Sequence, residues 1–355
     1  MTRLALSVAL ILGLLVGCAE RQGADPASGE SSITTSRSSA SEGGIGGTGA
    51  PSRGETIASD DKEGGIGGTG IFGTITSFGS IVVNGQTVKF GEEVVQSREQ
   101  ITGRELPLSV GSAVIVEARS EEDGWIAERV ALFLPLVGPV SVVDPASGTL
   151  SVMGTSILLE DDAAIVDRRG HADGEIIDLG AIAMGDRLAV SGIWKGGEIV
   201  ASRIDRLDDD GPHAASGLLL LTSDGMLVGG TQLTSDCCSE LDAPAYVQLF
   251  GRYLDDLFEV DRLETGVTLL FSRKIERLIV EAFLARDPIG EGFHLSGFGI
   301  PADQSATVKT LPGVRSLFVG AYDDAFHIRQ SVVLPAGTVA RENVLQSLGD
   351  LTRPD

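Results

Sequence analysis

From Ile71 onward, short runs of alternating apolar and polar residues are separated by Gly, Asn and Asp. Alternation with a period of two places the apolar side chains on one face of a β-strand, and the separating residues are those that favour tight turns. Helical spacing is rare along this region. The pattern therefore predicts an all-β structure made of many short strands.

Four stretches of this region share one register, in which a glycine stands six residues after the start and an aliphatic residue follows three positions later. The stretches are residues 79–88, 148–157, 224–233 and 291–300, and the shared glycines are Gly85, Gly154, Gly230 and Gly297. Asn84-Gly85 is a strong signal for a two-residue hairpin, because both residues tolerate a positive φ. We therefore expect each stretch to form a β-hairpin that turns at its glycine.

Each copy continues with an alternating strand and ends with a strand that carries an arginine. The alternating segments are residues 114–116, 188–190, 247–249 and 317–319, and the arginines are Arg129, Arg203, Arg262 and Arg329. In the last three copies a glycine and then an aromatic residue follow the alternating segment, as in Gly192 and Trp194. An arginine at a strand end can cap carbonyl groups or pair with a neighbouring acid, so we expect a structural role for these arginines.

The copies define four repeats of four or five strands each. They span residues 71–135, 136–210, 214–273 and 274–335. Repeats of this size favour small closed or partly open barrels of the OB-like type, and they are short for independent cores, so neighbouring repeats should pack together.

Two segments near the C-terminus leave alternatives open. Residues 275–284 form an apolar run that Glu276, Arg277 and Glu281 interrupt unevenly, so a helix competes with a strand there. Its place at the start of the fourth repeat favours the strand. Residues 336–355 are predicted to be a polar C-terminal tail, in which residues 341–348 can form a short helix.

The N-terminus has the pattern of a bacterial lipoprotein signal. Arg3 precedes an apolar run over residues 4–16, which is too short to span a bilayer permanently but has the length of a signal-peptide core. Leu15-Val16-Gly17-Cys18 then resembles the lipobox of lipoproteins. We expect cleavage of residues 1–17 and lipidation of Cys18 with acyl chains such as palmitate. The alternatives are an ordinary secretory signal with a chance cysteine, or a buried apolar strand.

The segment behind Cys18 predicts a flexible stalk that places the protein in the cell envelope. Residues 18–70 are rich in Gly and Ser and have almost no apolar content, so they cannot form a core. The heptapeptide Gly-Gly-Ile-Gly-Gly-Thr-Gly occurs at residues 43–49 and 64–70, and the second copy can add an edge segment to the first repeat. Ala19 lacks the charge of an inner-membrane retention signal, which favours the outer membrane, facing the periplasm or the cell surface.

Residues of the first two repeats, together with the second heptapeptide, resemble a known family. Residues 71–85 behind the second heptapeptide, together with residues 184–192 and 199–204, resemble an uncharacterised family of bacterial secreted and lipid-anchored proteins, catalogued only as a domain of unknown function. The resemblance implies tandem small β-barrels and an envelope location. It implies no catalytic residues, because the family has none assigned.

The net charge of the chain limits the classes of partner that it can bind. The net charge is -23, and Arg3 is the only charged residue before Cys18, so processing makes the chain more negative still. Such a surface repels phosphate backbones, so nucleic-acid binding is not expected. Apart from Cys18 the chain contains only Cys237 and Cys238, which are adjacent and could form a disulfide or act as a redox pair.

No established catalytic or metal-binding motif is present. The histidines are His171, His213, His294 and His327, and no two have metal-ligand spacing, although His294 and His327 could meet across a sheet of the fourth repeat. The run Asp208-Asp-Asp-Gly211 suggests calcium, but Arg206 and Gly217 stand where an EF-hand loop needs acidic ligands. We interpret this run as a hydrated acidic linker, and we expect no metal and no cofactor.

These features predict a membrane-anchored envelope lipoprotein that is not an enzyme. The tandem barrels would present a surface to an envelope protein or a glycan, while the lipid on Cys18 supplies the membrane contact. The alternative is a periplasmic hydrolase with a pair of carboxylates between repeats.

Overall fold

A computed structural model gives the fold of the chain. It describes residues 68–347, except 122–123, 171–172, 224, 235–236, 239–240, 242, 267–268, 273, 288–291 and 305–310. Cys18, the predicted signal peptide, most of the predicted stalk and His171 lie outside the described residues. Among the helices that are described, none has the length and apolar character needed to cross a membrane.

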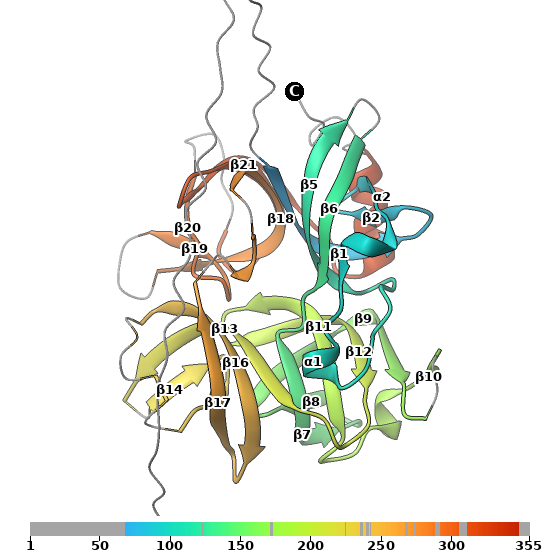
Figure 1. The fold of residues 1–355 in the computed structure, drawn as a ribbon, viewed down its shortest axis with the longest axis vertical. Helices are drawn as coiled ribbons and strands as arrows, with labels where there is room; N and C mark the ends of the chain where they lie inside the picture. Colours follow the sequence, from blue (N-terminus) through green and yellow to red (C-terminus); the bar gives the residue numbers. More distant parts are fainter. Residues whose placement is uncertain are drawn as a thin grey trace, which may run out of the picture. The chain divides into compact units, whose positions relative to one another are not determined.

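Strands dominate the described residues and form two sheets of eleven strands (Figure 1). The first sheet contains β1 (Gly68–Ser77), β2 (Ile81–Val83), β3 (Gln86–Lys89), β4 (Val95–Gln96), β5 (Ala113–Glu121), β6 (Gly124–Leu132), β18 (Ile275–Arg286), β19 (Phe293–Leu295), β20 (Pro301–Gln304), β21 (Arg315–Tyr322) and β22 (Phe326–Val333). The second contains β7 (Leu136–Asp144), β8 (Thr149–Val152), β9 (Thr155–Asp167), β10 (Glu175–Ile177), β11 (Arg187–Lys195), β12 (Glu198–Arg206), β13 (His213–Thr222), β14 (Gly225–Val228), β15 (Thr231–Gln232), β16 (Ala245–Leu254) and β17 (Leu257–Thr265). The helical elements are η1 (Glu92–Val94), α1 (Glu99–Thr102), η2 (Leu179–Ala181) and α2 (Thr338–Ser347).

The predicted all-β fold of small tandem barrels is confirmed, and the sheets add a pairing between repeats. The first and fourth repeats share one sheet, because β1 runs parallel to β18. The second and third share the other sheet, because β7 pairs with β13 in the antiparallel sense. Residues 275–284 are part of strand β18, as the sequence favoured. Gly68, Thr69 and Gly70 of the second heptapeptide belong to β1, which lies between β18 and β5 and not at an edge of the sheet.

The shared glycines stand at hairpins, as predicted, but for different reasons. Asn84 and Gly85 both have a positive φ in the β2–β3 turn, and Met153 and Gly154 do the same between β8 and β9. Gly230 lacks a positive φ; a Cβ atom there would lie 2.4 Å from the carbonyl oxygen of Gly154. Strands β19 and β20 also pair, but residues 296–300 form a longer connection around Gly297.

A β-bulge recurs in the last strand pair of every repeat and explains the glycine that follows the alternating segment in the last three repeats. At the bulge, Gly251 approaches β17 so closely that a Cβ atom would lie 1.9 Å from the carbonyl oxygen of Glu259. Gly192 and Gly320 meet the same constraint at 2.5 and 2.0 Å, whereas the first repeat has Ala118 at this position.

The position of the bulge in each repeat shows that one of the four recurrent arginines was assigned to the wrong place. The residue after the bulge is paired in register with the opposite strand, and the pairs are Glu117 with Arg129, Ser191 with Arg203, Phe250 with Arg262 and Val319 with Gln330. The prediction that Arg329 occupies the matching place was therefore wrong, because Arg329 is the bulged residue. Gln330 holds the equivalent position.

The C-terminal tail contributes to the interior, which the sequence did not predict. Helix α2 begins at Thr338, and its Arg341 and Leu345 are buried. These residues are four apart and therefore share one helix face. The carboxylate of Asp162 on β9 accepts a hydrogen bond from the backbone N–H of Thr338 at 2.7 Å, which caps the helix.

Candidate functional site

A cleft with a volume of about 210 Å³ lies where the second, third and fourth repeats meet. Its residues come from the end of β11 and the β11–β12 turn, strand β13, the β14–β15 turn, the end of β18, and β19 with the turn that follows it. The lining residues are Trp194, Gly196, Gly197, Leu218, Leu220, Gly229, Ala285, Arg286, His294, Ser296 and Gly297.

Trp194 forms a fixed wall of the cleft. Its indole N–H donates to the carbonyl oxygen of Ser216 at 3.0 Å, which satisfies the one polar group of this buried side chain. Two turn glycines leave room for the ring: a Cβ atom would lie 2.5 Å from it at Gly229 and 2.1 Å from it at Gly297. The recurrent turn glycine of the fourth repeat is thus also a residue of the cleft.

One hydrogen bond joins opposite sides of the cleft. The backbone N–H of Gly196 in the second repeat donates to the hydroxyl of Ser296 in the fourth repeat at 2.7 Å. A Cβ atom at Gly196 or Gly197 would meet no atom within 4 Å, so the space beside this turn is open. The Gly196–Ser296 hydrogen bond holds the second and fourth repeats together at the cleft.

The polar groups of the cleft can donate hydrogen bonds, and only one of its residues carries a fixed charge. Arg286 is exposed, and its guanidinium lies 5.8 Å from the centroid of the Phe293 ring. Burial lowers the pKa of His294, against an opposing effect of Asp287, so this imidazole is neutral at neutral pH. Among the described residues that line the cleft, none is Asp or Glu.

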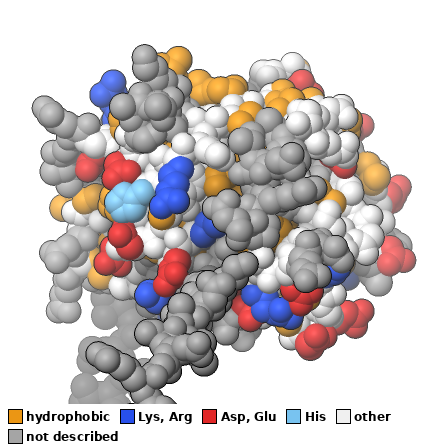
Figure 2. Space-filling model, turned by 90° about the horizontal axis from the view of Figure 1, so that it is seen from above, with side chains coloured by type: hydrophobic (Ala, Val, Ile, Leu, Met, Phe, Trp, Pro, Cys, Tyr) orange, Lys and Arg blue, Asp and Glu red, His pale blue; other side chains and the backbone are white. Residues whose placement is uncertain are grey.

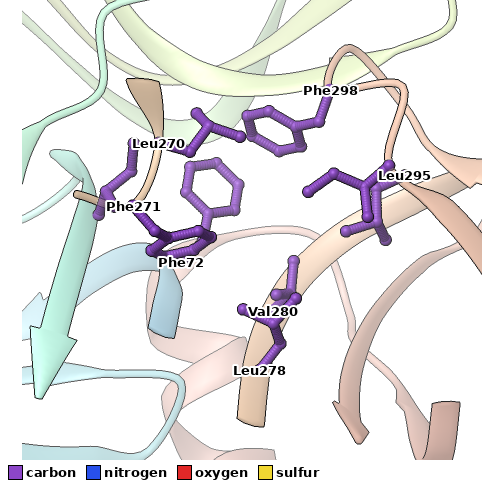
Figure 3. A pocket seen from close by; sticks show the side chains of 9 residues that line it. Phe72, Leu270, Phe271, Leu278, Val280, Leu295 and Phe298 are labelled. Carbon is purple, nitrogen blue, oxygen red and sulfur yellow. The ribbon is translucent and has the colours of Figure 1, made fainter. Parts of the chain in front are cut away.

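A second, much smaller cavity lies in the core between the first, third and fourth repeats. Figure 3 shows its apolar lining, in which Phe298 and Leu270 lie opposite Phe72. The Phe72 and Phe298 rings meet edge to face, with centroids 4.8 Å apart. The free volume is about 10 Å³, which is at the lower limit for one water molecule, so this cavity is a packing defect and not a ligand site.

The most buried carboxylates are held by arginines. Arg341 contacts both carboxylate oxygens of Glu160, at 2.7 and 2.8 Å, and its Nε lies 3.1 Å from Oε1 of Glu281. Arg315 contacts the same two glutamates, and Glu281 also accepts the backbone N–H of Thr74 at 2.9 Å. Burial, together with the neighbouring Arg341, lowers the pKa of Arg315. This group of two acids and two bases joins the second and fourth repeats to α2, and Thr74 connects it to the first repeat.

The recurrent arginines make the structural contacts expected of them in the first three repeats. Arg129 donates to the carbonyl oxygen of Leu270 at 3.0 and 3.1 Å and lies 3.4 Å from Glu117. Arg203 donates to Asp205 through Nε and a terminal nitrogen, both at 2.9 Å. Arg262 pairs with Glu264 and stacks on Phe250, with 3.7 Å from its central carbon to the ring centroid. Arg329 is exposed on β22.

The acidic linker surrounds a buried arginine. Arg187 on β11 donates to the carbonyl oxygens of Ile101 and Thr102 in α1, and to that of Asp208 in the linker. The exposed carboxylates of residues 208–210 raise the pKa of Arg187, although burial lowers it by more. Within the described part of the chain, no group of three or more His, Cys, Asp or Glu side chains could hold a metal ion.

The described histidines lie in separate surroundings. His213 accepts the backbone N–H of Tyr253 through Nδ1 at 2.8 Å. His294 and His327 do not meet as the sequence allowed, because β20 lies between their strands. His327 lies between Asp303 and Asp323, at 2.7 Å from each, and these carboxylates raise its pKa. Figure 2 shows a histidine with acidic neighbours on the surface.

Cys237 and Cys238 form a disulfide in the loop between β15 and β16. Cys238 is buried in the core, and Cys237 packs against the same core while partly exposed. The pair therefore anchors its loop to the third repeat. It does not line the cleft described above.

Sequence reasoning did not find the cleft as a site. It identified Gly297 and Trp194 as repeat positions, but Arg286, Leu218 and Leu220 carry no motif. They meet only because the fourth repeat packs against the second and third. The one sequence signal that pointed to this site was Arg286, a single arginine at the end of the apolar strand β18.

Comparison with known proteins identifies part of the chain. No curated protein and no solved structure matches it. Residues 72–131 and residues 137–205 each match the model of a domain of unknown function, DUF5666. These two matches coincide with the first and second repeats. The chain therefore carries two tandem segments that are similar to this family of domains of unknown function.

Proposed function

We propose that this protein is a lipid-anchored binding protein of the cell envelope, not an enzyme, and that it holds a small ligand in the cleft between its second, third and fourth repeats. The observation that carries the proposal is the cleft itself, with its volume of about 210 Å³ and its mostly apolar lining. Concave apolar sites with a few polar groups are the usual form of a small-molecule site.

The fold supports a cleft that exists before the ligand arrives. Trp194 is fixed by its hydrogen bond to Ser216, and the Gly196–Ser296 hydrogen bond spans the repeats. A site that is already formed does not have to be ordered on binding, which favours affinity. The barrels therefore act as a rigid frame around the site.

The envelope location is supported by the sequence. The lipobox-like residues Leu15 to Cys18 follow a short apolar run, and a stalk rich in Gly and Ser separates them from the first strand. Lipid on Cys18 would hold the protein at the membrane while the stalk lets the barrels extend from it. The acidic chain would not bind anionic lipid through its surface.

The hydrolase alternative receives no support from the cleft. Hydrolysis by a carboxylate pair requires two acids that face each other across the substrate. No acid is among the described lining residues, and Glu117, Glu160 and Glu281 are each bound to arginines elsewhere.

The binding proposal can be tested by filling the cleft. Leu220 lines it, whereas the adjacent Leu221 is 71 % exposed and does not, so Leu220→Trp and Leu221→Trp are a matched pair. The full-length variants and the wild type would be incubated with a cell-envelope extract, and the retained small molecules identified by mass spectrometry. We expect the wild type and Leu221→Trp to retain a compound that Leu220→Trp loses. Identical sets from all three proteins would refute the proposal.

The anchoring proposal has a separate test. Globomycin, which inhibits the lipoprotein signal peptidase, should cause an unprocessed precursor to accumulate. Cys18→Ser should move the protein from the membrane fraction to the soluble fraction. Unchanged membrane association of Cys18→Ser would overturn the lipid anchor.

A further inference from the structure

The charge of the cleft differs in sign from that of the whole protein. The chain has a net charge of -23, yet Arg286 is the one residue with a fixed charge among the described residues that line the cleft. The carboxylate of the nearby Asp287 acts on His294 but is not part of the lining. No ion-pair partner of Arg286 is found in the described part of the chain, where its contact is the ring of Phe293. A low-dielectric cleft with charge of one sign concentrates its field on a ligand of the opposite sign.

The neutral polar groups of the cleft are compatible with an anionic ligand. The hydroxyl of Ser296 accepts the N–H of Gly196, which leaves its own proton free to be donated. His294 is half-buried and neutral, so one ring nitrogen carries a proton that it can donate. A carboxylate accepts hydrogen bonds from such donors, and an arginine strengthens the interaction through its charge.

The rest of the cleft surface is apolar, so the part of the ligand that contacts it should be apolar as well. Leu218, Leu220, Ala285 and Trp194 provide its side-chain walls, and glycines in three turns provide the rest. The volume is below the range of sites for drug-sized ligands. The ligand should therefore be smaller than a typical drug-sized molecule. A multiply charged or sugar-like ligand would leave polar groups against these apolar walls.

We propose that the ligand of the cleft is a small amphipathic monocarboxylate, with its aliphatic or aromatic body against Leu218 and Leu220 and its carboxylate at the Arg286 end. This inference rests on the proposed function, because it names the class of ligand that the same cleft binds.

The test uses hexanoate as the probe and hexanamide as its neutral isostere. Binding of each would be measured by calorimetry to the full-length protein in lipid nanodiscs, with empty nanodiscs as the blank. We expect hexanoate to bind more tightly than hexanamide. We expect Arg286→Gln to weaken hexanoate binding by about tenfold or more without affecting hexanamide, because a charge-assisted contact is lost. Arg329→Gln, which removes an exposed arginine of the same repeat, should change neither affinity.

The outcomes separate this inference from the proposed function. If both probes bind equally and Arg286→Gln has no effect, the carboxylate assignment is wrong while the cleft remains a binding site. If neither probe binds but the envelope extract yields a compound that depends on Leu220, the ligand belongs to another class. If hexanoate binds equally well to Leu220→Trp, it binds outside the cleft and the inference fails.

Discussion

The buried charges around Arg341 make a quantitative prediction about the C-terminal helix. Arg341 is fully buried and holds both oxygens of Glu160 as well as one oxygen of Glu281. Arg341→Met keeps much of the side-chain volume but leaves two buried carboxylates with Arg315 as their one remaining arginine. Removal of one partner from a buried ion pair costs about 3–5 kcal/mol, because the other charge stays buried without compensation. We expect a loss of this size in the free energy of unfolding.

The assay is urea unfolding of the full-length protein, followed by circular dichroism, with Arg252→Met as the control. Arg252 pairs with Glu259 at 3.5 Å, but its side chain is 65 % exposed, so its loss should cost less than about 1 kcal/mol. Adding Glu160→Gln to Arg341→Met should recover part of the loss, because the uncompensated charge is removed. If Arg341→Met is no more destabilising than the control, the buried network does not hold α2 in place.

Two further predictions concern the barrels. Burial, aided by Arg187, lowers the pKa of His213 to about 4, so between pH 6.5 and pH 4 the unfolded chain binds more protons than the folded one. The contribution of His213 to stability is full above pH 6.5 and should fall by about 1–2 kcal/mol as the pH drops to 4, a modest loss because His213 is only partly buried. His213→Asn, which keeps a hydrogen-bond acceptor, should lose this pH dependence in urea titrations. An unchanged pH dependence would contradict the assignment. At the bulge, Gly251→Ala should lower the free energy of unfolding by about 1–3 kcal/mol, because the added Cβ atom would collide with the backbone. Ala118→Gly at the equivalent position of the first repeat should lower it by about 0.5–1 kcal/mol. Equal shifts in melting temperature for the two variants would refute this account of the bulge.

Local patterns in the sequence were enough to predict the strands and turns. Asn84-Gly85 predicts its hairpin because positive φ is required at both positions, and the structure has it there. The alternating segments lie in strands, as that pattern predicts, although three of the four are buried on both faces. Arg329 was misplaced because a bulge shifts the register by one residue, and the sequence alone does not show which residue bulges.

Contacts between repeats could not be predicted in the same way. The pairing of β1 with β18 joins residues that are about two hundred positions apart, and no local signal specifies it. The same holds for Arg341, whose charge suggested an exposed tail although two glutamates from two repeats, Glu160 and Glu281, compensate it in the core. The cleft also depends on such contacts, which is why its residues were not recognised as a group.

The central claim is that the cleft between three repeats binds a small monocarboxylate. The most direct measurement is an amide NMR titration of the full-length protein with hexanoate. Gly196, Gly197, Gly229 and Gly297 report on its sides from all three repeats. The account predicts that these amide signals shift together with one dissociation constant, and that Leu220→Trp abolishes the shifts. Unchanged glycine signals at hexanoate concentrations that shift signals elsewhere in the protein would contradict it.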